Sequence, residues 1–113
     1  MREIVKRPQA RRDIMEQADY IARTSLNASD RFLKATQEAF RKIATMPGIG
    51  SPRDFNNPAL QGLRVFFVPR FSKIGIYSLT TETTTEIVRV LHGARDIASI
   101  FAPKSEEETQ ADE

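Results

Sequence analysis

Hydrophobic residues in the first part of the chain recur every three or four positions, which is the spacing of an amphipathic helix. Between residues 9 and 24 they are Ile14, Ala18, Ile21 and Ala22, and charged residues occupy the other faces. Pro8 stands just before this stretch, and its fixed φ suits the first turn of a helix. The pattern predicts a helix at about residues 9–24, preceded by a short strand at residues 3–6.

A second helix is predicted directly after the first. Asn27 can cap its first turn, and Asp30 adds a negative charge where the helix dipole favours one. Apolar residues mark its buried side through about Met46: Phe32, Ala35, Ala39, Phe40 and Ile43. Because the connection between the two helices is short, they should form an antiparallel hairpin.

After a loop rich in proline, glycine and asparagine, the spacing changes to that of strands. Residues 63–68, 73–79 and 85–92 are rich in Val, Ile, Phe and Tyr, and they predict a three-stranded antiparallel meander. The predicted fold class is therefore α+β. An N-terminal strand and the meander form an antiparallel sheet, the helical hairpin packs on one face, and the other face stays free.

The length and composition limit the possible classes of protein. The chain of 113 residues suits one domain, which we place at residues 1–103, followed by an acidic tail at 104–113 that we expect to be disordered. With no cysteine and one histidine, we expect no disulfide, no metal and no cofactor. Neither a signal peptide nor a membrane-spanning segment is visible, so we expect a cytoplasmic protein without a membrane partner.

The net charge of +2 conceals an uneven distribution. Residues 104–113 hold one basic and five acidic residues, a sum of −4, so residues 1–103 carry +6. A basic folded body favours an anionic partner, either nucleic acid or an acidic protein. Charge that serves only solubility is the alternative, and the composition leaves it open.

The predicted sheet carries cations suited to such a partner. Alternation places Arg89 with Ile87 and Leu91, on the face opposite Val88 and Val90. There it either extends across an exposed sheet face or contacts a partner. Four further cations lie on or beside the sheet: Arg64, Arg70, Lys73 and Arg95. Together they would form a cluster of donors for phosphate or carboxylate.

Aromatic residues are interleaved with these cations. Phe66, Phe67 and Phe71 can stack on bases or anchor a protein partner. Core packing is the alternative, and strand alternation requires it for either Phe66 or Phe67. His92 is interpreted as a partly buried residue at a strand end, because no carboxylate nearby in the sequence would activate it for catalysis.

Residues 86–97, with the sequence EIVRVLHGARDI, resemble the closing signature of the ParE branch of the ParE/RelE toxin superfamily. Three further segments match in the same order: Tyr20-Ile21-Ala22, Ala39-Phe40 through Pro47, and Gly62-Leu63-Arg64. Together the matches span about residues 4–101. The resemblance implies a ParE/RelE-like fold and the toxin of a type II toxin-antitoxin pair, held in a hetero-oligomer with a ParD-like antitoxin.

The resemblance implies two possible activities. ParE-like members inhibit DNA gyrase by binding, which is the function that we favour, whereas RelE-like members cut messenger RNA on the ribosome. If the chain were such a ribonuclease, the candidate catalytic residues would be Arg70, Lys73 and Arg95. Those ribonucleases often have a tyrosine near the C-terminus, where this chain has Phe101, and a phenyl ring cannot exchange a proton. The candidates for partner binding are Arg64, Phe66, Phe71, Arg89 and Arg95.

Overall fold

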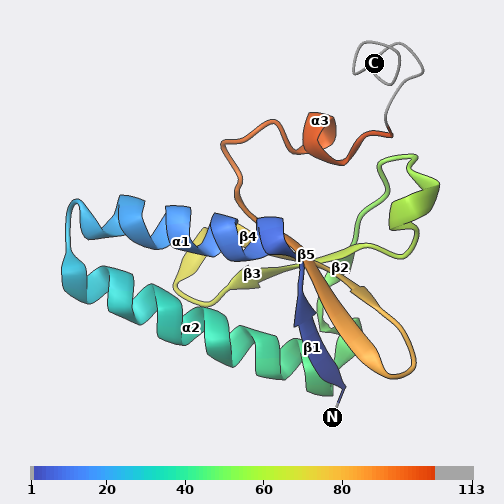
Figure 1. Cartoon of the computed structure of the whole chain (residues 1–113), viewed down its shortest axis with the longest axis horizontal. Coiled ribbons are helices and arrows are strands. Elements are labelled where there is room, and N and C mark those ends of the chain that lie inside the picture. Colours follow the sequence, from blue (N-terminus) through green and yellow to red (C-terminus); the bar gives the residue numbers. More distant parts are fainter. Residues whose placement is uncertain (1, 104–113) are drawn as a thin grey trace.

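The computed structural model describes residues 2–103, so the predicted acidic tail at residues 104–113 lies outside the described residues. The six predicted elements occur in the predicted order, and four short elements that the sequence does not predict are added (Figure 1). They are β1 (Glu3–Lys6), α1 (Pro8–Ala22), α2 (Leu26–Thr45), η1 (Pro47–Ile49), β2 (Ser51–Pro52), η2 (Pro58–Leu60), β3 (Arg64–Val68), β4 (Phe71–Thr80), β5 (Thr84–His92) and α3 (Ile97–Phe101). The predicted helices and the three meander strands match α1, α2, β3, β4 and β5 to within two residues at each end.

The five strands form one sheet in the order β1-β5-β4-β3-β2, and the predicted meander β3-β4-β5 is antiparallel. β1 pairs with β5 in parallel, with Val5 opposite Glu86, so the sheet is mixed where an entirely antiparallel sheet is predicted. A parallel pair requires a crossover connection, and the helical hairpin after β1 is part of that connection. Hydrophobic spacing cannot reveal strand direction, which is why this edge differs from the prediction.

The helical hairpin covers one face of the sheet and builds the main core. Phe32, Phe40 and Ile43 of α2 are buried against Ile76 of β4 and Val90 of β5. Figure 1 shows α1 and α2 side by side along the sheet, joined by a short turn. The predicted hairpin and its buried face are therefore confirmed.

The N-cap of α2 differs from the prediction. The hydroxyl oxygen of Ser25 accepts a hydrogen bond from the backbone N–H of Ala28 at 3.1 Å, and Ser25 has an extended backbone. Asn27 lies inside the first turn of the helix. Serine and asparagine are both favoured caps, so residue preference alone could not choose between two positions so close together.

The opposite face of the sheet is covered, although the sequence predicts that it is free. Phe101 of α3 is buried there between the rings of Phe55 and Tyr77, with centroid distances of 5.2 and 4.7 Å. The side-chain amide of Asn57 donates to the carbonyl oxygen of Phe101 at 3.0 Å, which joins α3 to the loop before β3. A second core results, and it also contains Leu63, Val65, Val88 and Leu91. Apolar residues on both faces of the strands require two covers.

Candidate partner-binding surfaces

A β-bulge in β5 determines the direction of Arg89. Ser78 pairs with Ile87 and Tyr77 pairs with Arg89, so Val88 is an extra residue between the two pairs. An extra residue breaks the alternation of side chains between the faces of a strand. The alternation that predicts the face of Arg89 therefore fails at this bulge.

The guanidinium group of Arg89 binds a buried carboxylate on α1. Its Nε and Nη2 donate to the Oδ2 and Oδ1 atoms of Asp13 at 2.7 and 3.0 Å. Asp13 also accepts from the backbone N–H of Val90 at 3.0 Å and from the side-chain amide of Gln9 at 3.1 Å. Arg89 thus joins β5 to α1. A contact between Arg89 and a partner stays a prediction, and it would have to share the guanidinium group with Asp13.

Arg64 also has an internal role in the structure. Its Nη1 donates to the carbonyl oxygen of Gly50, which holds the turn after α2 against β3. A Cβ atom on Gly50 would lie 2.8 Å from the carbonyl oxygen of Val65, so the close approach of this turn requires glycine. The half-buried side chain of Arg64 is therefore less available to a partner than the sequence suggests.

The aromatic candidates lie in two environments. Phe66 packs against the main core, and Phe71 is half-buried with its ring edge-on to Phe32 at a centroid distance of 5.4 Å. Phe67 is exposed, as alternation predicts for one of the adjacent pair. Both Phe66 and Phe71 are half-buried, so only part of each side chain is accessible to a partner.

Two of the three candidate catalytic residues share one cavity. Arg70 and Lys73 line it together with His92 and with Tyr20 of α1. His92 Nδ1 accepts a hydrogen bond from the backbone N–H of Ala94 at 3.0 Å, which leaves Nε2 as the nitrogen that faces other groups. No carboxylate lines this cavity among the described residues. The cavity therefore offers cations and one imidazole to an anion, without a carboxylate to serve as a base.

Arg95 is exposed in the turn between β5 and α3 and does not line that cavity. Phe101, which the resemblance predicts at the position of the ribonuclease tyrosine, is part of the second core. The structure thus gathers Arg70 and Lys73, while Arg95 lies outside their cavity and Phe101 is buried.

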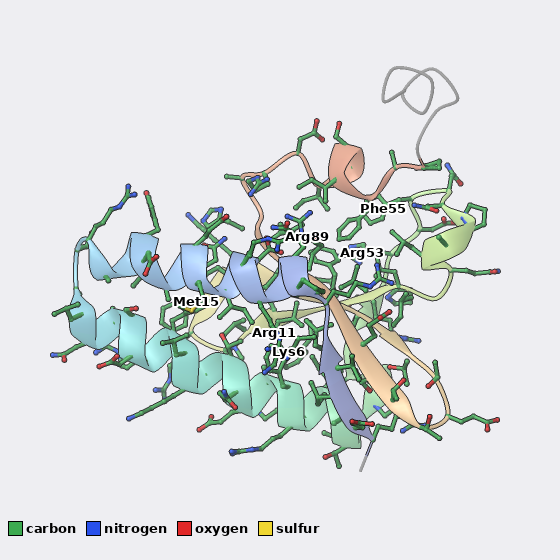
Figure 2. All side chains as sticks on the ribbon, viewed as in Figure 1. Lys6, Arg11, Met15, Arg53, Phe55 and Arg89 are labelled. Atoms are coloured by element: carbon green, nitrogen blue, oxygen red, sulfur yellow. The ribbon has the colours of Figure 1, made fainter. Side chains whose placement is uncertain are left out.

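A groove between α1 and α2 was not identified from the sequence. Its apolar lining includes Met15, Leu33 and Phe40, and its polar rim includes Lys6 and Arg11. Figure 2 shows Lys6, Arg11 and Met15 between the two helices. The sequence signal for this hairpin groove is Met15, an apolar residue at the edge of the predicted apolar stripe, seven residues before Ala22. The groove combines apolar anchors with positive charge and suits an acidic amphipathic segment.

Within the described residues, no helix is both long enough and apolar enough to cross a membrane.

Comparisons with known proteins relate the chain to one family. Residues 4–97 match the family described as the ParE toxin of type II toxin-antitoxin system, parDE. A solved structure described as a chromosomal ParDE TA system from P. aeruginosa has a similar fold, with a TM-score of 0.64 and 15% sequence identity. The likeness covers 81% of this chain and 96% of that chain. A comparison with curated protein sequences finds no match. Because the family match extends over most of the chain, the protein belongs to the ParE toxin family of type II toxin-antitoxin systems.

Proposed function

We propose that this protein inhibits DNA gyrase by binding it in the cytoplasm, and that a cognate ParD-like antitoxin neutralises it in a hetero-oligomer. The family match over residues 4–97 carries this proposal. Phe101 supports binding over cleavage, because its buried phenyl ring cannot exchange a proton as the tyrosine expected at that position in a RelE-like ribonuclease could.

The target is tested with purified full-length protein in a gyrase supercoiling assay. Inhibition of supercoiling, or accumulation of cleaved DNA, is the expected result. A parallel assay incubates the protein with ribosomes that carry messenger RNA. If message is cut at the ribosome and gyrase stays active, the gyrase proposal is rejected. The RelE-like alternative then gains support if a Lys73→Ala variant loses the cleavage.

The hairpin groove is the proposed binding site of the antitoxin. Met15 is 57% exposed there, beside Leu33 and Phe40, with the cations of Lys6 and Arg11 at the rim. An antitoxin helix with apolar residues on one face and carboxylates at its edge fits both features.

A charge placed on the floor of this groove should disrupt the complex. We expect Met15→Glu to weaken antitoxin binding at least tenfold, because it buries a carboxylate against the apolar face of the antitoxin. Met46→Glu is the matched control, since Met46 is 53% exposed and lies outside the groove. Binding is measured by titration calorimetry with the protein encoded by the neighbouring gene. Equal losses in both variants would place the antitoxin elsewhere.

A further inference from the structure

A second groove lies between α2 and the turn that joins β3 to β4. Four cations line it: Arg31, Lys34 and Lys42 from α2, and Arg70 from the turn. Glu38 is the one carboxylate among its lining residues, so the groove has an excess of three positive charges. Within the described part of the chain, none of these four cations forms a salt bridge. Their charges are therefore available to an external anion.

The cations of α2 form a row. Arg31, Lys34 and Lys42 are separated by three and eight residues, spacings that keep them on one side of a helix with 3.6 residues per turn. At 1.5 Å per residue, the row extends over about 16 Å. A DNA duplex carries one negative charge per about 1.7 Å of its axis, so a duplex that lies against the row presents several phosphates within its length.

Arg70 occupies a backbone conformation that costs free energy for a residue other than glycine. Its φ is +70°, in the left-handed region, whereas the chain uses glycine at position 62, where φ is +88°. The backbone of this turn thus gives no reason for arginine at position 70. Its guanidinium group lines both the α2 groove and the neighbouring cavity that contains Lys73, so the two surfaces are continuous.

The lining of the α2 groove favours a backbone ligand over a protein partner. Its apolar residues are the small Ala28 and Ala35, together with Pro69 and the half-buried Phe71. Protein interfaces depend on large apolar anchors, which the hairpin groove has and the α2 groove lacks. Stacking of bases requires an exposed ring face, and the Phe71 ring is held edge-on to Phe32. Cations without apolar anchors or base-reading groups are typical of phosphate contacts.

We propose that the α2 groove binds the phosphodiester backbone of a nucleic acid through Arg31, Lys34, Lys42 and Arg70, without reading the base sequence. The inference concerns a surface separate from the proposed antitoxin groove, and it does not depend on the identity of the toxin's target. If gyrase is the target, such a contact would hold the toxin against the DNA that the enzyme carries.

The test measures binding of the full-length protein to a short labelled DNA duplex between about 50 and 200 mM salt. The groove variant combines Lys34→Gln with Lys42→Gln. The control variant combines Arg12→Gln with Arg53→Gln; it removes the same charge, and neither residue lines the α2 groove or the hairpin groove. We expect the groove variant to make the negative slope of log affinity against log salt shallower by about 2, at roughly 0.9 per phosphate contact. The control should keep the slope of the unmodified protein.

Equal slopes for the two variants, or no binding of the duplex by the unmodified protein, would overturn the proposal. Two further ligands, an RNA duplex and polyglutamate, show which class of anionic molecule the groove binds. A matched RNA duplex shares the phosphodiester chemistry, so binding of DNA, of RNA or of both in the groove supports the inference and shows which nucleic acid is preferred. Groove-dependent binding of polyglutamate without binding of either duplex would instead assign the groove to an acidic protein.

Arg70 permits a test in which folding and binding should change in opposite directions. Glycine accepts φ of +70° without strain, so Arg70→Gly should keep or raise the Tm while it weakens duplex binding. Gly-substituted protein that binds the duplex as tightly as the unmodified protein would remove Arg70 from the proposed site. Because the fold is expected to survive, a loss of binding cannot be attributed to unfolding.

Discussion

Asp13 and Arg89 illustrate how one buried charge orders its surroundings. The side chain of Asp13 is 2% exposed and that of Arg89 is 19% exposed, so the pair is mostly removed from water. A buried carboxylate is stable only when it is paired and hydrogen-bonded, and Asp13 accepts from three residues. The pair joins α1 of the helical hairpin to β5 of the sheet.

Removal of Arg89 should therefore destabilise the protein strongly. We expect Arg89→Ala to lower the free energy of unfolding by about 3 kcal/mol, because it leaves the charge of Asp13 buried without its partner. Arg7 provides a control: its salt bridge to Glu86 joins side chains that are 39% and 34% exposed. Arg7→Ala should cost less than about 1 kcal/mol. Urea denaturation measures both, and similar losses would contradict the structural role of Arg89.

Tyr77 connects the second core to the pH dependence of stability. Burial raises the pKa of the Tyr77 hydroxyl above its usual value of 10.0, and the positive charge of Arg53 opposes this shift in part. A raised pKa in the folded state means that folding favours the neutral phenol. The corresponding stability is present below about pH 10 and is lost as the pH rises through the folded-state pKa.

Tyr77→Phe should reduce this alkaline loss of stability. The phenyl ring keeps the packing against Phe101 and removes the group that titrates. We expect the free energy of unfolding to fall less steeply above about pH 9 in Tyr77→Phe than in the unmodified protein. Tyr20→Phe is the control, because Tyr20 is exposed. An identical pH dependence for Tyr77→Phe and the unmodified protein would show that another group controls the alkaline transition.

At the scale of elements, the first turn of α2 depends on Ser25, and the packing of α3 over the second core depends on Phe101. Ser25 satisfies a backbone N–H of the first turn of α2, which no residue within the helix can do. Phe101 attaches the five residues of α3 to the sheet through its contacts with Phe55 and Tyr77. The Ser25 cap is a local contact, whereas Phe101 acts through residues distant in the sequence.

The N-cap assignment leads to a comparison of two alanine substitutions. Ser25→Ala should lower the free energy of unfolding by about 1 kcal/mol, because a backbone N–H loses its acceptor. Asn27→Ala should have little effect or stabilise the helix slightly, since Asn27 is exposed and alanine has the higher helix propensity. Thermal unfolding followed by circular dichroism tests both variants. A larger loss in Asn27→Ala would restore Asn27 as the cap.

At the scale of the whole molecule, two grooves of different chemistry use the same helix. α2 contributes Leu33 and Phe40 to the hairpin groove, and Lys34 and Lys42 to the α2 groove. One partner can therefore bind the apolar groove while an anion occupies the basic one. Residues 104–113 lie outside the described residues, but their sum of −4 follows from the sequence and opposes the +6 of the rest.

Deletion of residues 104–113 should tighten binding of nucleic acid at low salt. The acidic segment is attached to the basic body and competes with phosphates for the same cations. The effect should be modest, because exposed ion pairs contribute about 0–1 kcal/mol each, and it should vanish near 1 M salt. A chain with neutral residues in place of the five acidic ones is the control for length. Equal binding of all three proteins at low salt would leave solubility as the role of the segment.

Much of the local structure could be predicted from the sequence. Helical spacing predicts α1 and α2, strand spacing predicts β3, β4 and β5, and the segment at residues 86–97 indicates the family. These features depend on residues close together in the sequence. The 3.6-residue period of a helix and the two-residue period of a strand can therefore be read from the sequence. The similar solved structure agrees with the α+β fold class that spacing predicts.

The candidate sites depended more strongly on tertiary contacts. Arg64 and Arg89 are single basic residues in the sequence, and their internal partners, Gly50 and Asp13, become visible only when the chain is folded. Asp13 and Arg89 are 76 residues apart, a distance at which no local pattern connects them. The hairpin groove and the α2 groove likewise require segments from different elements to meet.

The sequence by itself therefore determined the order of the two long helices and four of the strands, the buried side of the hairpin and the membership of the ParE family. Tertiary structure alone decided the parallel pairing of β1, the bulge at Val88, the cover that Phe101 places on the second face, and the partner of each arginine. The physical reason is the range of the interactions. Periodic burial is encoded within one turn or one pleat, whereas strand direction, bulges and ion pairs are chosen by the free energy of contacts between distant segments.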